Sequence, residues 1–269
     1  MTVTCLFPDA SSVRDNNPVE WPRKYDLFGL GISAASYEEA ERVVLAAACR
    51  RLGGLVTHFS VHGVATAALD PAYRSKINQF DIVAADGQPV RWALNRFHRA
   101  GLCDRLYGPE LMLRLCQAAA GNGIGVYLYG SSPEVLEKLS RSLLSRFPGL
   151  RLVGCESPPF RSLTREEAAA TVARINASGA GLLFVGLGCP RQDLFAYEHR
   201  QAIKAVQLCV GAAFDFHAGT KRMAPLWMQK RGLEWLFRMW QEPARLSRRY
   251  LRANTVFLFL VGRRILRGC

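Results

Sequence analysis

The sequence lacks paired cysteines. Its eight cysteines are scattered, with no C-x-x-C motif and no nearby histidine to complete a zinc set (Cys5, Cys49, Cys103, Cys116, Cys155, Cys189, Cys209 and Cys269). This spacing excludes a zinc finger or ribbon and indicates a reducing cytosol. Free cysteine is among the most buried residue types, so we expect most of these thiols to be small buried apolar groups.

Long hydrophobic runs are also missing. No uncharged apolar stretch reaches the roughly 18 residues that a membrane-spanning helix needs. The first 22 residues have no basic start followed by an apolar run, so they do not resemble a secretory signal. We therefore expect residues 1–24 to be a flexible leader, and the protein to be cytoplasmic with at most a peripheral contact with the membrane.

The chain has little acid to balance its basic residues. Its 35 Lys and Arg against 22 Asp and Glu give a formal net charge of +13, which points to an anionic partner such as phosphate, acidic lipid or nucleic acid. We find no zinc finger, RNP-like aromatic motif or helix-turn-helix pattern that would favour nucleic acid. Charge alone does not choose among these partners.

Short apolar runs alternate with segments of helical period from residue 25 to about residue 219. This alternation predicts an α/β domain, residues 25–220, with a Rossmann-like parallel sheet and helices on both faces. Seven strands are expected in the segments LFGLGIS, GGLVTHFSV, FDIVAAD, GVYLYG, LRLVG, GLLFVGLG and AVQLCVGAA. Helices are expected at residues 37–51, 89–98, 109–120, 133–146, 164–177 and 190–203.

Several predicted strands end in glycine or aspartate, notably at Asp86-Gly87, Gly130, Gly186 and just before Asp215. In open parallel sheets the ligand crevice lies beyond the carboxyl ends of the strands, where following helices point free N–H groups at phosphates. We therefore take these residues as binding-site candidates. The alternative is that the glycines only make tight turns and that Asp86 caps the helix that begins near Pro89.

The last segment, residues 221–269, is strongly basic and is predicted to be a helical appendage. It carries twelve Lys and Arg against two Glu, a net charge of +10, and Pro225 and Pro243 should divide it into separate helices. Its final helix combines an arginine stripe with an apolar stripe, which predicts a helix lying in the headgroup region of an anionic membrane. The alternative is an amphipathic helix packed on its own domain. The two stripes are Arg245, Arg248, Arg249, Arg252 and Leu246, Tyr250, Ala253, Phe257, Leu260.

Eight stretches in order resemble the WecG/TagA/CpsF glycosyltransferases of bacterial surface-polysaccharide and wall-polymer assembly. They cover residues 25–254: VTHFSVHGV, FDIVAADGQPVRWALN, RLYGPELM, VYLYGSSPEV, FPGLRLVGCESPPF, INASGAGLLFVGLGCPRQDLF, VGAAFDFHAGTKRMAP and GLEWLFRMWQEPARLSRRYL. The resemblance implies a Rossmann-like core, a UDP-sugar donor, an undecaprenyl-diphosphate-linked acceptor, inversion without a metal, and an appendage that meets the membrane. N-acetylmannosamine is the first donor sugar it suggests, and a homo-oligomer is one option it leaves open.

The same resemblance implies roles for individual residues. The family's proposed general base corresponds to Asp86. Substrate-binding positions fall on the matching motifs at Thr57, Gly87, Gln88, Arg105, Gly130, Gly186, Gln192, Asp215, Arg238, Arg245, Arg248 and Arg249. The chain departs from the pattern at Phe59, where many members have Asn, and at Asp193, where they have Glu, so the donor sugar is not carried across.

Two other residue patterns bear on the chemistry. No two aspartates are separated by one position, so the chain lacks the D-x-D pair on which metal-dependent glycosyltransferases hold Mn or Mg. The dinucleotide fingerprint G-x-G-x-x-G is incomplete, because Gly186-Leu-Gly188 continues with Cys-Pro-Arg. A nicotinamide-dependent oxidoreductase and a basic nucleic-acid binder remain the alternative functions.

Overall fold

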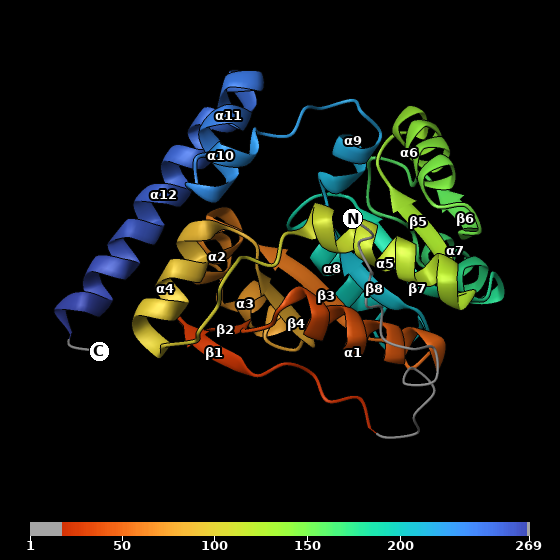
Figure 1. Cartoon of the computed structure of the whole chain (residues 1–269), viewed down its shortest axis with the longest axis horizontal. Coiled ribbons are helices and arrows are strands. Elements are labelled where there is room, and N and C mark those ends of the chain that lie inside the picture. Colours follow the sequence, from red (N-terminus) through yellow and green to blue (C-terminus); the bar gives the residue numbers. More distant parts are fainter. Residues whose placement is uncertain (1–17, 268–269) are drawn as a thin grey trace, which may run out of the picture.

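The computed structural model describes residues 18–267 and has one eight-stranded sheet in the order β1-β2-β4-β3-β8-β7-β5-β6 (Figure 1). All neighbouring strands are parallel except β1 and β2, which form an antiparallel hairpin at one edge. The strands are β1 (Lys24–Leu27), β2 (Leu30–Ser33), β3 (Leu55–Phe59), β4 (Ile82–Ala85), β5 (Gly125–Gly130), β6 (Arg151–Glu156), β7 (Ala180–Gly186) and β8 (Val206–Cys209). The predicted α/β class is confirmed.

Helices cover both faces of this sheet, as predicted. One apolar core lies under α1 (Tyr37–Cys49), α5 (Gly108–Asn122), α6 (Pro133–Arg146) and α9 (Ala213–His217). The other lies under α2 (Val61–Leu69), α3 (Pro71–Ile77), α4 (Gln88–His98), α7 (Arg165–Ala177) and α8 (Arg191–Glu198). Strand residues point alternately to the two faces, so both cores are filled by the same strands.

The sequence predictions were wrong in three local places. The first expected strand is the β1–β2 hairpin, whose turn residues Phe28 and Gly29 both have positive φ, as a two-residue turn between right-twisted strands requires. The second expected strand was predicted to run to Val61, but β3 ends at Phe59 and α2 begins at Val61. Neither α2 nor α3 was predicted. The last expected strand ends at Cys209, and α9 begins at Ala213.

The prediction that most thiols are buried was also wrong for the described part of the chain. Cys116 and Cys209 are buried and Cys189 is half-buried, whereas Cys49, Cys103 and Cys155 are exposed. The exposed thiols lie at the end of α1, in the loop after α4 and on the edge strand β6, where little packs over them. Cys5 and Cys269 lie outside the described residues, as does most of the predicted leader; residues 18–23 form no helix or strand.

The basic C-terminal segment forms three helices, and proline sets two of their starts as expected. These are α10 (Leu226–Lys230) after Pro225, α11 (Glu234–Gln241), and α12 (Pro243–Leu266), which starts at Pro243. The stripe Leu246, Tyr250, Ala253 and Phe257 is buried, and α12 packs on α2. The predicted apolar stripe therefore faces the protein's own core. No helix within residues 18–267 is long and apolar enough to cross a membrane.

Candidate active-site cleft

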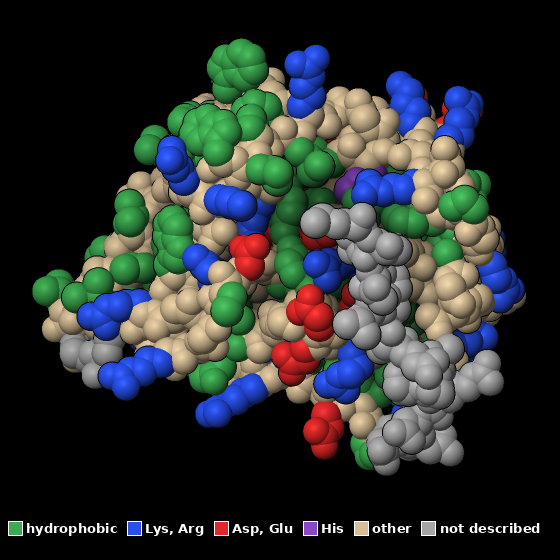
Figure 2. Space-filling view, viewed as in Figure 1, with side chains coloured by type: hydrophobic (Ala, Val, Ile, Leu, Met, Phe, Trp, Pro, Cys, Tyr) green, Lys and Arg blue, Asp and Glu red, His purple; other side chains and the backbone are tan. Residues whose placement is uncertain are grey.

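A cleft of about 1560 Å³ lies between the carboxyl ends of the parallel strands and the C-terminal helices. One wall, which we call the core wall, consists of the residues that follow β3, β4, β5, β6, β7 and β8. The opposite wall, the appendage wall, comes from α11, α12 and the segment before them, residues 221–265. Figure 2 shows the hollow, with acidic and basic side chains at its mouth and hydrophobic ones in its depth. The sheet-edge position predicted for a ligand crevice thus coincides with the cleft.

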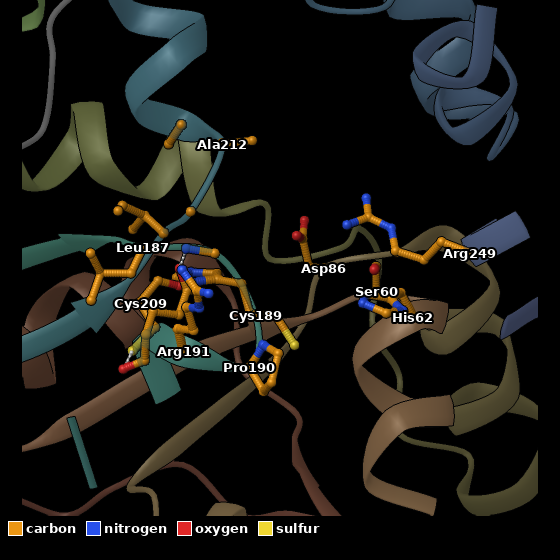
Figure 3. A pocket seen from close by; sticks show the side chains of 18 of the residues that line it. Ser60, His62, Asp86, Leu187, Cys189, Pro190, Arg191, Cys209, Ala212 and Arg249 are labelled. Atoms are coloured by element: carbon orange, nitrogen blue, oxygen red, sulfur yellow. Dashed lines mark hydrogen bonds between the residues drawn. The ribbon is translucent and has the colours of Figure 1, made fainter. Parts of the chain in front are cut away.

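Asp86 follows β4 directly and projects into the middle of the cleft, with the Arg249 guanidinium on the opposite side (Figure 3). It does not cap α4, because the N-cap residue is Gly87 and no side chain accepts a capping hydrogen bond there. Its Oδ1 atom is buried and has no hydrogen-bond partner. A buried acceptor without a partner is uncommon in proteins, so this atom is free to accept a proton from a ligand.

The surroundings of Asp86 raise the pKa of its carboxyl group to about 7. Burial is the largest cause, because it penalises the charged form, and the negative charge of Glu234 adds to it. The positive charges of Arg105 and Arg238 and the backbone amide of Gly108 act in the opposite direction. A carboxyl group with this pKa is half ionised near neutral pH, which suits proton transfer.

Arg105 joins the core wall to the appendage wall. Its guanidinium donates to Glu234 Oε2 at 2.7 Å and to Gln229 Oε1 at 3.0 Å, and also to the backbone oxygen of Asp86 at 3.2 Å. Tyr107 donates its hydroxyl proton to the other oxygen of Glu234 at 2.9 Å, and its ring lies under the Arg105 guanidinium. Arg105, predicted to bind substrate, therefore lines the cleft but is already engaged by protein groups.

Thr57 lies beneath the cleft rather than in its lining. It is fully buried on β3 and donates to Asp193 Oδ1 at 2.6 Å, while Tyr73 donates to Asp193 Oδ2 at 2.7 Å. Burial raises the pKa of the Asp193 carboxyl group, and these two donors counteract that effect. Asp193, at a position where the resembled family has Glu, thus ties β3 and α3 to α8.

Gln192 lies in the first turn of α8 and lines the cleft. It is buried, and its Oε1 accepts the backbone N–H of Gly188 at 3.1 Å, so it is not a solvated surface residue. Gly186 also lines the cleft, whereas Gly130 does not. The two glycines pair across β5 and β7, and a Cβ atom on Gly130 would come within 2.8 Å of the Gly186 backbone. Gly130 is therefore explained by strand packing.

Gly87 and Gln88 complete the core wall beside Asp86. A Cβ atom on Gly87 would lie 3.4 Å from the Ser60 Cα, so glycine lets the loop after β4 approach the start of α2. Gln88 is buried at the first position of α4 and donates to Asp104 at 3.3 Å. Its Oε1 atom is buried without a partner, so it offers a second free acceptor close to Asp86.

The predicted arginine cluster divides in two. Arg238, Arg245 and Arg249 line the cleft, whereas Arg248 is exposed and lies outside the lining. Arg249 Nε is buried without a hydrogen-bond partner, which leaves part of this guanidinium available to a ligand. Arg245 pairs with Glu242 at the rim of the cleft.

Asp215 is the acidic member of a charged chain at the same rim. It accepts a hydrogen bond from Thr220 at 3.3 Å and lies 3.8 Å from the Lys221 ammonium group. Lys221 in turn contacts Glu242 at 3.1 Å. The predicted site residue Asp215 therefore faces the cleft from α9, next to the start of the appendage wall.

His58 and His62 are two of the three histidines that line the cleft, the third being His199. His58 is buried, and its Nδ1 lies 3.2 Å from the Cys209 oxygen while Nε2 has no partner. Burial lowers its pKa to about 4. His62 lies with Ser60 beneath Arg249 (Figure 3), and burial together with Arg249 and Arg238 lowers its pKa to about 4. Both imidazoles are neutral at pH 7 and can accept or donate a hydrogen bond.

The sequence from residue 25 to residue 268 matches the model of the glycosyl transferase WecG/TagA/CpsF family. The chain belongs to this family. The match covers both walls of the cleft, so the resemblance inferred from the eight stretches is confirmed. Among the enzyme classes that the sequence left open, the match identifies a glycosyltransferase rather than a nicotinamide-dependent oxidoreductase.

The fold of this glycosyltransferase brings ten of the thirteen predicted site residues to the cleft lining. Gly130 and Arg248 lie outside the lining, and Thr57 lies one layer below it. Sequence reasoning missed Glu234, Tyr107, His58 and His62. Glu234 belongs to the EW motif, four residues before Arg238, so the sequence marked it as a candidate. Nothing in the sequence indicated that its partner is Arg105. Within residues 18–267 no three His, Cys, Asp or Glu side chains gather as ligands for a metal ion.

Proposed function

We propose that this glycosyltransferase moves a sugar from a UDP donor to an undecaprenyl-diphosphate-linked saccharide, with inversion at the anomeric carbon and without a metal ion. The observation that carries the proposal is the Asp86 carboxyl group, which lies in the middle of the cleft with a free oxygen and a pKa of about 7. This is the environment expected of a general base that works at neutral pH.

In the proposed reaction, Asp86 takes the proton of the acceptor hydroxyl group as that oxygen attacks the anomeric carbon. The bond from this carbon to the UDP oxygen breaks, and its electron pair leaves with UDP. Arg238 lines the cleft and its charge acts on the Asp86 carboxyl group, so it faces the region in which the diphosphate charge of UDP would develop. Guanidinium groups stabilise such charge through charge-assisted hydrogen bonds, which is the role that a metal ion fills in D-x-D enzymes.

The helices that start at the core wall support a nucleotide site there. Two residues separate the end of β5 from the start of α6, and four separate the end of β7 from the start of α8. Ser131 and Ser132 before α6, and Gln192 in the first turn of α8, line the cleft. Helix N-termini carry unsatisfied N–H groups and favour anions. The UDP diphosphate is therefore proposed to lie at the core wall, and the acceptor to approach from the appendage wall.

Peripheral membrane association is part of the proposal. On α11 and α12 several large apolar side chains are exposed, and basic residues lie among them (Figure 2). They include Leu236, Trp240, Leu251, Leu258, Phe259, Ile265 and Leu266. Apolar side chains mixed with Lys and Arg are typical of helices that lie on anionic membranes. We propose the inner face of the cytoplasmic membrane as the place of action.

A donor panel tests the reaction. The purified protein is incubated with UDP-N-acetylmannosamine, UDP-N-acetylglucosamine, UDP-glucose and UDP-glucuronic acid and a short-chain prenyl-diphosphate saccharide, and the products are weighed by mass spectrometry. UDP-N-acetylmannosamine is the expected donor, and EDTA should not lower the rate. Absence of any glycosylated product with all four donors would refute the proposal.

A further inference from the structure

The two ends of the cleft differ in chemistry. At the β5 and β7 end, the lining is rich in hydroxyl, charged and backbone groups, such as Ser131, Ser132 and Arg165. The other end runs between α4 and α12 and is mostly apolar. We call it the α4–α12 groove, lined by Trp92, Phe97, Phe257, Leu258, Val261 and Ile265.

The groove is long and continuous with the catalytic region. The lining residues of α12 run from Arg249, opposite Asp86, to Ile265 near the end of the helix, which at 1.5 Å per residue spans about 24 Å. α4 lies beside the C-terminal half of α12 (Figure 1), where the Arg264 guanidinium lies over the Phe97 ring and contacts His98. Phe28 links the two helices, with its ring 6.4 Å from that of Phe97 on α4 and 5.9 Å from that of Phe257 on α12.

The groove has a cationic inner end and an apolar outer part. Its inner end carries Arg249, whose Nε is buried without a partner, and its outer part exposes apolar carbon from Trp92, Leu258 and Ile265. A ligand that matches both has an anionic head and a long apolar tail. Burial of each methylene group of such a tail is favourable, and a trough between two helices suits an extended chain better than a bulky partner.

We infer that the α4–α12 groove binds the first isoprene units of the lipid-linked acceptor and so places its diphosphate at Arg249 and its saccharide hydroxyl at Asp86. This inference rests on the proposed function. It makes Trp92, Leu258 and Val261 acceptor-specificity residues that touch no part of the donor. The chain length and the apolar character of the acceptor then determine its KM.

The test uses two neighbouring residues of α12. Leu258 and Phe259 are 68% and 66% exposed, but Leu258 lines the groove and Phe259 is not among its lining residues. Leu258→Asp should raise KM about tenfold or more for a saccharide diphosphate with a geranyl chain. It should leave KM unchanged for the UDP-sugar and for the same acceptor with a methyl group. Phe259→Asp should change none of these values in detergent-free solution.

Two results would overturn the inference: equal effects of the two substitutions, or a wild-type enzyme that uses geranyl and methyl acceptors with the same KM. The first would mean that the exposed face of α12 acts only as a general hydrophobic surface. Circular dichroism of both variants checks that α12 remains helical, and Trp92→Ala, on the opposite wall of the groove, should reproduce the effect of Leu258→Asp.

A binding readout separates failure of the groove from failure of the proposed function. Benzophenone-tagged geranyl diphosphate is photo-crosslinked to the full chain, without donor, and the attachment site is mapped by mass spectrometry. Attachment to residues 89–97 or 254–265 supports the groove even if no sugar transfer is found. Attachment confined to α10 or α11, or its persistence in Leu258→Asp, overturns the groove while leaving the transfer reaction intact.

Discussion

The two walls of the cleft are built in different ways. On the core wall, one set of buried polar side chains is fixed by internal hydrogen bonds: Thr57 and Tyr73 hold Asp193, and Gln192 accepts the Gly188 amide. Asp86 Oδ1 and Gln88 Oε1 on the same wall are buried acceptors without a partner. On the appendage wall, Arg249 keeps a buried N–H group without a partner. The core wall thus combines a preorganised frame with free acceptors, whereas the appendage wall offers the Arg249 N–H group to a phosphate-bearing ligand.

Asp86 stands between the walls, and its pKa depends on both. Burial in the core raises the pKa, and the charges that modulate it come from Arg105 of the core and from Glu234 and Arg238 of the appendage. The Arg105–Glu234 ion pair, with side chains only 9% and 13% exposed, is therefore both a mechanical link and an electrostatic one. The packing of the appendage on the core therefore helps to set the charge around the Asp86 carboxyl group.

The largest effect on activity is expected at Asp86, which lies between the two walls. Asp86→Asn should lower the rate of transfer by at least about 100-fold, because the amide cannot accept the hydroxyl proton. UDP binding, measured by calorimetry, should stay within a few-fold of the wild-type value. A variant with normal turnover would remove Asp86 from the mechanism.

The same substitution makes a separate prediction about stability. Because the folded pKa of Asp86 is about 7 and its ordinary value is 3.8, the folded protein holds this proton more tightly than the unfolded chain. Wild-type stability therefore falls as pH rises from about 4 to about 7, and Asn escapes this loss. Asp86→Asn should have a higher Tm than the wild type at pH 8 and the same Tm at pH 4.

The next effect compares two adjacent arginines of the appendage. Arg249 lines the cleft opposite Asp86, and Arg248 is exposed outside the lining. Arg249→Gln should lower kcat/KM about tenfold to 100-fold, because the acceptor diphosphate loses a charge-assisted hydrogen-bond partner. Arg248→Gln should stay within about twofold in assays without membranes. Equal losses from the two variants would show that overall positive charge, rather than placement, is what matters.

The electrostatic link predicts a smaller but directional change. Since the free base must be ionised, kcat/KM of the wild type should rise with pH up to about 7 and then level off. Glu234→Gln removes a negative charge that raises the pKa of Asp86. It also frees the Arg105 guanidinium from its ion pair, and the positive charge of Arg105 lowers the pKa of Asp86. Both changes move the midpoint of the pH profile to lower pH. A profile that keeps its midpoint would disconnect Glu234 from Asp86.

The sequence predicted the core wall better than the appendage wall. The Asp86-Gly87 pair ends an apolar strand, and strand ends of a parallel sheet meet at one edge, so local pattern sufficed to place it. The Arg105–Glu234 pair joins residues 129 positions apart, and no local period encodes it. Helix α2 was not predicted because it is packed between the sheet and α12. A helix covered on both sides lacks the polar face by which a surface helix is recognised in a sequence.

The direction of α12's apolar stripe was misjudged for a related reason. A helix that packs on its own domain and a helix that lies on a membrane share the same amphipathic pattern. Leu246, Tyr250, Ala253 and Phe257 turn out to be buried, so the membrane proposal now rests on a different face that includes Leu251 and Phe259.

The smallest effect on catalysis is expected from the layer beneath the core wall. Thr57→Val keeps the side-chain shape but leaves Asp193 Oδ1 without its donor at 2.6 Å. The free energy of unfolding should fall by about 1–3 kcal/mol, the cost of an unsatisfied buried acceptor, while KM for the donor changes little because Thr57 lies outside the cleft lining. Chemical denaturation and donor kinetics on one preparation measure both. A rise in donor KM without loss of stability would instead mean that Thr57 reaches the substrate, and that the core wall rearranges when the nucleotide binds.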